Sequence, residues 1–200
     1  MSTTNASPSG RNPWPGEPKR VLSVLVEERP DLLAQTVGLL QRRNFRSVAV
    51  NVGATEQSHV ARLTLSFEGP ESEAERLVRE LSRLLYVLAV EDLSTAPSVV
   101  REMALLKVRV DAAHRAQISQ LCEAFRARPV DVTPETVTLE ITGAASKIEG
   151  FIAVLRPFGI AEMTRTSPIA LARADKTLQV EGPPSSWLER RRRQSAATVS

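Results

Sequence analysis

The 200-residue sequence has a single cysteine, few aromatic side chains and no long apolar run. One cysteine, Cys122, excludes an internal disulfide and any zinc site built from several cysteines. Aromatic residues make up only 4% of the chain, so aliphatic side chains must form its core. Every apolar run is shorter than the ~18 residues of a membrane span, and the first 20 residues lack the apolar segment of a signal peptide. We therefore predict a cytoplasmic protein with no membrane-spanning segment.

Recognisable catalytic motifs are also missing. The sequence has no phosphate-binding P-loop, no Gly-x-Gly-x-x-Gly motif and no His-Glu-x-x-His motif. His59 and His114 have no ligand-like spacing, and Cys122 falls on the inner side of a predicted helix, which favours ordinary surface histidines and a packed thiol. Glu27 and Glu28 are adjacent at a strand end, where neighbouring side chains point to opposite sides. We predict no catalytic residues, no metal site and no enzymatic activity of the chain alone.

The net charge of +3 is concentrated at the ends of the chain. Residues 1–20 have three basic side chains and one acidic, and residues 175–200 have five basic and three acidic, so the two ends together carry +4 and the body carries −1. A nearly neutral body lacks the face of one sign that phosphate recognition needs. We expect no nucleic-acid partner. A nucleic-acid-binding regulator that uses the basic run at residues 190–193 is the alternative from a different functional class.

The first apolar stretch of the chain predicts a strand, a helix and a second strand. Residues 21–26 form an apolar run of strand composition, Pro30 suits a helix start, and residues 47–52 return as a strand. The loop at residues 27–31 then lies beside a helix N-terminus, where free N–H groups can hold an anion. The helix side chains expected to face the sheet are Leu33, Val37 and Leu40, flanked by Leu32, Thr36 and Leu39.

The same order of elements occurs twice along the chain. A strand at residues 60–68, a helix at 71–85 and a strand at 87–90 complete the order β-α-β-β-α-β, which is the ferredoxin-like arrangement. A second set follows with strands at 103–110, 130–133, 137–142 and 160–165 and helices at 112–126 and 145–155. We predict an α+β chain of two tandem ferredoxin-like domains, each a four-stranded antiparallel sheet with two helices on one face.

Proline-rich and polar segments divide the chain into five parts. They are a disordered arm (residues 1–18), a first domain (19–95), a linker (96–102), a second domain (103–174) and a disordered basic tail (175–200).

Five blocks of the sequence resemble the small, regulatory subunit family of acetolactate synthase (acetohydroxyacid synthase). They are LSVLVEERPDLLAQTVGLLQRRNF (22–45), ATEQSHVARLTLSFEG (54–69), REMALLKVRV (101–110), FRARPVDVTPETVTLEITG (125–143) and RPFGIAEMTRTSPIALAR (156–173). The resemblance implies that the first domain is an ACT domain that forms a homodimer and binds a branched-chain amino acid. It also implies a partner, the large catalytic subunit of acetolactate synthase, in which thiamine diphosphate, Mg and FAD are expected. The chain itself is expected to hold no cofactor.

The sequence departs from the family pattern at the predicted binding corner. Where the family has Asn-x-x-Gly after the first strand, this chain has Glu28 and Asp31, and the family's Gly-(Phe/Tyr)-Asn-Ile becomes Asn44 to Ser47. The effector-binding positions implied by the resemblance are Glu28, Asp31, Leu32, Leu33, Arg46 and Ser47. An acidic side chain there repels an effector's carboxylate, and Arg46 is placed to pair with Asp31 across a dimer interface. We expect an altered or lost valine site. The alternative is a divergent ACT-domain paralogue that senses another small molecule or serves another enzyme.

Overall fold

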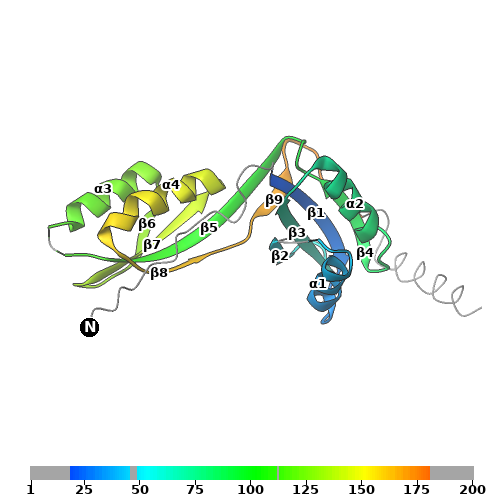
Figure 1. Ribbon diagram of the computed structural model, residues 1–200, viewed down its shortest axis with the longest axis horizontal. Coiled ribbons are helices and arrows are strands. Elements are labelled where there is room, and N and C mark those ends of the chain that lie inside the picture. Colours follow the sequence, from blue (N-terminus) through cyan, green and yellow to red (C-terminus); the bar gives the residue numbers. More distant parts are fainter. Residues whose placement is uncertain (1–18, 46–48, 112, 181–200) are drawn as a thin grey trace, which may run out of the picture.

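A computed structural model describes residues 19–45, 49–111 and 113–180. Within these ranges the chain forms two α+β units in succession (Figure 1). The predictions for the arm at residues 1–18 and for residues 181–200 of the tail lie outside the described residues. Among those that are described, no helix combines the length and apolar character needed to cross a bilayer.

The first unit has the predicted β-α-β-β-α-β order. Its elements are β1 (Lys19–Glu27), α1 (Leu32–Arg42), β2 (Ala49–Ala54), β3 (Val60–Glu68), α2 (Glu71–Leu81) and β4 (Val87–Asp92). The strands form an antiparallel sheet in the order β2-β3-β1-β4, so β2 lies at one edge and β4 at the other. This is the ferredoxin-like arrangement that the sequence predicts.

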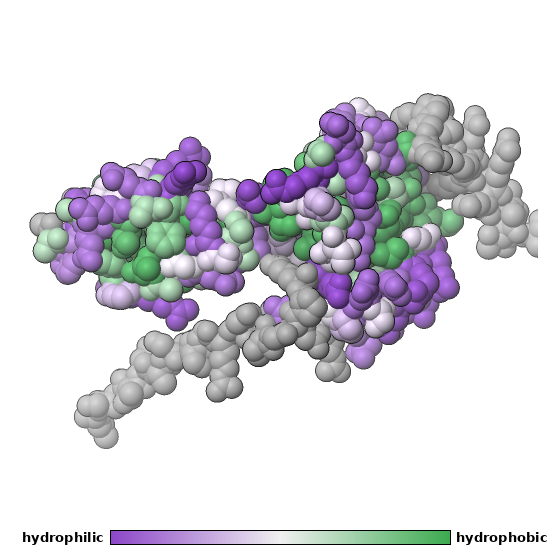
Figure 2. Space-filling view, turned by 90° about the horizontal axis from the view of Figure 1, so that it is seen from above, coloured by the Kyte–Doolittle hydropathy of each residue, from purple (hydrophilic) through white to green (hydrophobic). Residues whose placement is uncertain are grey.

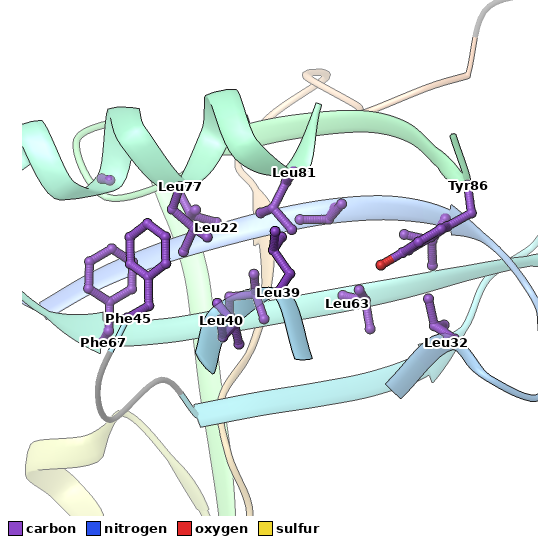
Figure 3. Packing of buried hydrophobic residues seen from close by; sticks show 14 of the residues in the cluster. Leu22, Leu32, Leu39, Leu40, Phe45, Leu63, Phe67, Leu77, Leu81 and Tyr86 are labelled. Atoms are coloured by element: carbon purple, nitrogen blue, oxygen red, sulfur yellow. The ribbon is translucent and has the colours of Figure 1, made fainter. Parts of the chain in front are cut away.

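The core of the first unit lies between the sheet and its two helices. Alternate side chains of β1 and β3 face the helices, because successive residues of a strand lie on opposite faces. Figure 3 shows Leu77 and Leu81 of α2 above Leu22 of β1, with the Phe45 and Phe67 rings side by side. All five side chains are buried. Apolar alternation in the strands and helical spacing in α2 therefore account for this packing.

The buried side of α1 differs from the prediction. The buried residues are Leu32, Thr36, Leu39 and Leu40, whereas Leu33 is 49% exposed and Val37 is 41% exposed. The helix is thus rotated by about one residue from the expected orientation. Thr36 can be buried because its hydroxyl donates to the Leu32 carbonyl at 2.9 Å, which satisfies its polar group inside the helix. The sequence analysis had placed Thr36, with Leu32 and Leu39, at the flank of the predicted apolar stripe.

The second unit repeats the architecture. Its elements are β5 (Ser98–Arg109), α3 (Arg115–Phe125), β6 (Arg128–Val132), β7 (Thr136–Gly143), α4 (Ala145–Leu155), the 3-10 turn η1 (Arg156–Phe158) and β8 (Ile160–Arg165). The strand order is β6-β7-β5-β8, all antiparallel. Figure 1 shows α3 and α4 together on one face of this sheet. Phe151 and Leu155 of α4 are fully buried against Leu106 and Leu139 of the sheet.

The two units join through a strand that the sequence analysis assigned to a linker. Strand β5 begins at Ser98, so the predicted linker is paired backbone from there on. Residues 98–101 pair with a short strand that was not predicted, β9 (Ile169–Ala172), and Glu102 pairs with Gly143 of β7. Ala170 of β9 is buried against Val21 and Leu93 of the first unit. Figure 2 shows the two lobes that this β5–β9 ribbon connects. The junction is therefore a packed ribbon.

A buried ion pair lies where the ribbon meets the second sheet. Glu102 of β5 is 4% exposed, and the Arg165 Nε at the end of β8 donates to its Oε2 at 2.6 Å. A charge this deep is stable only when it is paired and hydrogen-bonded. The pair therefore fixes β8 to β5 at the point where the chain turns toward β9.

The first part of the predicted tail packs on the first unit. Leu178 and Val180 contact Leu25 and Val60 on the sheet face opposite the helices. The Lys176 ammonium lies 2.9 Å from a carboxylate oxygen of Glu91. Residues 175–180 were assigned to a disordered tail because they are mostly polar. Two apolar side chains at alternate positions are enough to place this segment against the sheet.

Candidate functional site

The predicted binding corner is a hollow between the start of α1 and the edge strand β2. It has a volume of about 250 Å³. From the loop and α1 it is lined by Glu28, Arg29, Pro30, Leu32 and Leu33, and from β2 and β3 by Val52, Gly53, Ala54 and Ala61. Three of the six positions predicted to bind an effector, Glu28, Leu32 and Leu33, are thus brought together. We call this hollow the corner.

Asp31 stands beside the corner, and its carboxylate is already engaged. The Arg29 Nε donates to Asp31 Oδ1 at 3.1 Å, and Arg29 Nη2 donates to Oδ2 at 3.3 Å. The side-chain amide of Gln35, one turn into the helix, also donates to Oδ2. Arg29 thus pairs with Asp31 within one chain, and the pairing of Arg46 with Asp31 across a dimer interface stays a prediction. Arg46 and Ser47 lie outside the described residues.

Arg29 is the functional candidate that the sequence analysis missed. Its guanidinium lies 5.9 Å from the centre of the Tyr86 ring, so it is held between an aromatic face and a carboxylate. The fork geometry of a guanidinium matches a carboxylate, which is why Arg29 is the strongest carboxylate-binding group at the corner. The signal in the sequence was the Arg-Pro-Asp turn, which places a cation two residues before an acid at a helix start.

The N-terminus of α1 remains without a side-chain cap in the described structure. Asp31 occupies the capping position, but its side chain makes no hydrogen bond to the helix N–H groups. Instead its backbone carbonyl accepts the Gln35 N–H at 3.0 Å. The first turn contains no acidic residue, so the positive end of the helix dipole is not offset there by a carboxylate of the helix itself. The corner retains the helix end that the sequence analysis identified as anion-binding.

An exposed apolar surface adjoins the corner. Leu33 and Val37 of α1 and Val52 of β2 are all large and exposed. Strand β2 pairs only with β3 among the described strands, so its outer edge has unpaired backbone groups. An unpaired edge flanked by apolar side chains is typical of a surface that another chain covers.

The remaining titratable candidates form no catalytic set within the described residues. There, no three His, Cys, Asp or Glu side chains gather as a metal site would require. Burial raises the pKa of the Cys122 thiol, with a smaller contribution from the nearby Glu123 carboxylate. His114 Nδ1 lies 2.8 Å from Asp111 Oδ1, and its hydrogen bonds hold the pKa of Asp111 below the usual value. His59 lies in the loop before β3 with a positive φ of 64°.

Comparison with known proteins places both units in one family. Residues 22–89 match the family described as the acetohydroxyacid synthase small subunit-like ACT domain, and residues 101–174 match the family described as the small subunit of acetolactate synthase. The acetolactate synthase small subunit of Mycolicibacterium smegmatis is 38% identical over 161 residues, which are 80% of this chain and 95% of that protein. The chain belongs to the acetolactate synthase small-subunit family.

Two further members of this small-subunit family are similar to the chain over most of its length. The probable acetolactate synthase small subunit of Methanothermobacter thermautotrophicus is 38% identical over 159 residues, covering 79% of this chain and 95% of the relative. The crystal structure of the acetolactate synthase small subunit from Thermotoga maritima superposes with a TM-score of 0.74 at 34% identity, covering 79% of this chain and 99% of that one. The chain is accordingly a small regulatory subunit with an ACT domain, and not a catalytic one.

Proposed function

We propose that this chain binds and activates the large, thiamine-diphosphate-dependent subunit of acetolactate synthase in branched-chain amino acid biosynthesis. The observation that carries the proposal is similarity across both units to acetolactate synthase small subunits. Thiamine diphosphate, Mg and FAD are assigned to the catalytic partner, and a cytoplasmic location is part of the same proposal. Affinity purification of the tagged chain from its own cell, followed by mass spectrometry, should recover a thiamine-diphosphate enzyme in stoichiometric amount. Recovery of no such enzyme contradicts the proposal.

We also propose that the chain forms a homodimer through its ACT domain. The support is the unpaired edge of β2 together with the exposed side chains of Leu33, Val37 and Val52. A two-fold axis at this edge would pair β2 with its copy and cover the apolar surface. Val52→Asp should therefore convert a dimer into a monomer in sedimentation at micromolar concentration. Leu85→Asp is the control, because Leu85 is an exposed apolar residue that does not belong to this surface. A dimer that survives Val52→Asp refutes this interface.

The response to valine is proposed to be weak or lost. A free amino acid must compete for Arg29 with a carboxylate that is already bound to it. We expect no valine, leucine or isoleucine inhibition of the reconstituted complex at sub-millimolar concentration. The variant carrying Glu28→Asn, Asp31→Gly and Arg46→Asn should gain such inhibition. If the wild-type corner instead takes a different small molecule, the chain serves as the divergent ACT-domain sensor that is the alternative function.

A further inference from the structure

A second and larger hollow lies at the junction of the two units. Its volume is about 440 Å³. One side is formed by β2 and β3 of the first unit, and the other by the β5–β9 ribbon. We call it the junction hollow. The residues used below are Arg62 and Thr64 on the first side, and Arg101, Val99, Ile169 and Leu171 on the second.

The junction hollow contains two guanidinium groups that form no ion pair with any described carboxylate. Arg62 is half-buried, and its Nη1 donates to the hydroxyl of the fully buried Ser23 at 2.6 Å. Arg101 is exposed and donates to the Val100 carbonyl at 2.8 Å. One carboxylate, Glu56, also lines the hollow, so the formal charge of its lining is positive. A half-buried cation without a counter-ion is costly, and a bound anion offsets that cost.

The opposite wall is aliphatic. Val99 pairs with Leu171 and Arg101 pairs with Ile169 across the ribbon, so these four side chains share one face. Ile169 is 57% exposed and Leu171 is 56% exposed. A ligand that covers them removes apolar surface from water. The hydroxyl of Thr64, on the side of the cation, can donate one further hydrogen bond.

We propose that the junction hollow binds a small aliphatic monocarboxylate, with its carboxylate on Arg62 and its hydrocarbon part on Ile169 and Leu171. The volume lies in the lower part of the ~300–1,000 Å³ range of ligand pockets, which suits a small ligand. The site lies across the junction, so the ligand contacts both units and stabilises their packing. It opens on the other face of β2 and β3 from the corner, with which it shares only the lining residues Gly53 and Ala54. Its binding is measured on the isolated chain. It therefore stands or falls independently of the catalytic partner.

The test is an NMR titration of the isotope-labelled full-length chain with isobutyrate. Isobutyramide, its neutral isostere, is the ligand control. We expect saturable shifts at the amides of residues 62–64 and 169–171 with a dissociation constant in the millimolar range. Isobutyramide should bind at least about tenfold more weakly, because a charge-assisted pair is replaced by a neutral one. The Arg62→Met variant should weaken isobutyrate by about tenfold or more, while Arg83→Met, a change at an exposed arginine just after α2, should leave it unchanged.

Several results would overturn the proposal. They are the absence of saturable shifts at concentrations on the order of 0.1 M, equal binding of acid and amide, and unchanged affinity in Arg62→Met. If Arg62→Met does not fold, Arg101→Met is tested in its place, because the Arg101 side chain is exposed and its replacement should not disturb folding. Arg101→Met should weaken the binding of isobutyrate by about threefold or more. Affinity unchanged in Arg101→Met then counts against the site. Shifts at these amides that depend on protein concentration and not on isobutyrate identify a second copy as the occupant, and this also overturns the proposal.

Discussion

Replacing Asp31 by glycine should tighten valine binding to the isolated chain. The substitution removes the carboxylate that holds the Arg29 guanidinium and clears a side chain from the start of α1. A free carboxylate could then bind Arg29 while its oxygens face the uncapped helix end. The single substitution is informative because the cation that it releases, Arg29, is known from the structure.

Two effects bound the size of the change. The first is competition between Asp31 and valine for Arg29. The Arg29 and Asp31 side chains are 28% and 45% exposed, and an exposed ion pair is worth about 1 kcal/mol. Such a pair is formed for about 85% of the time, which weakens the binding of a competing carboxylate about sixfold. The second is repulsion between two carboxylates, about 4 kcal/mol at 4 Å and an effective dielectric of 20. Because Arg29 neutralises most of the Asp31 charge, only a small part of that repulsion applies. We therefore expect Asp31→Gly to bind valine about ten- to thirtyfold more tightly than the wild type, which is closer to the sixfold effect of competition than to the full effect of repulsion.

Calorimetric titration of valine into the wild type, Asp31→Gly and Asp31→Asn measures the effect. Asn keeps the size of the side chain and removes its charge, so Asp31→Asn should fall between the other two. Thermal unfolding of the variants serves as the control, with an expected loss below about 1 kcal/mol for Asp31→Gly. Sub-millimolar valine binding by the wild type, or equal affinity in wild type and Asp31→Gly, would refute the reasoning.

Three further predictions concern stability and reactivity. Arg165→Met removes a partner of the buried Glu102 carboxylate and should lower the free energy of unfolding in urea by about 2–3 kcal/mol. The double variant Arg165→Met, Glu102→Gln should lose less free energy of unfolding, because it leaves no unpaired charge. Equal losses in the two variants would show that the charge is not the cause. The buried Tyr86 hydroxyl has no hydrogen-bond partner in the described structure, and Figure 3 shows it pointing into the core, so Tyr86→Phe should raise the urea midpoint by the equivalent of about 1 kcal/mol. Because burial raises the pKa of the Cys122 thiol, the folded chain has less thiolate near pH 8 than the unfolded chain and should react slowly there with a disulfide reagent. A reaction as fast as that of the chain unfolded in ~6 M urea would contradict this prediction.

The sequence was most informative where local patterns agree with the tertiary environment. Strand β3, helix α4 and strand β8 have the predicted bounds, because in each case a Gly or Pro follows within three residues of the end of the pattern. The ferredoxin-like order followed from these elements. By contrast, β9 has only four residues and exists because β5 is there to pair with it, so no local pattern could identify it.

The candidate site was predictable in position but not in its contacts. The sequence placed the loop at residues 27–31 beside a helix start, and the family resemblance implied Glu28, Leu32 and Leu33 as effector positions. These three residues line one hollow in the structure, and their binding of an effector stays a prediction. Which cation holds Asp31 depends on side-chain geometry within one turn, where Arg29 contacts both the Asp31 carboxylate and the Tyr86 ring. The rotation of α1 was equally hidden, since two adjacent columns of apolar residues fit the helix and only contact with the sheet selects one.

The most direct test of the central claim is the rate of acetolactate formation by the purified catalytic subunit from the same cell, measured with and without this chain. The chain alone should form no acetolactate, and its addition should raise the turnover of the catalytic subunit severalfold in a saturable manner. Acetolactate formed by the chain alone would contradict the account. So would an unchanged rate in a mixture where sedimentation shows that the two proteins have formed a complex.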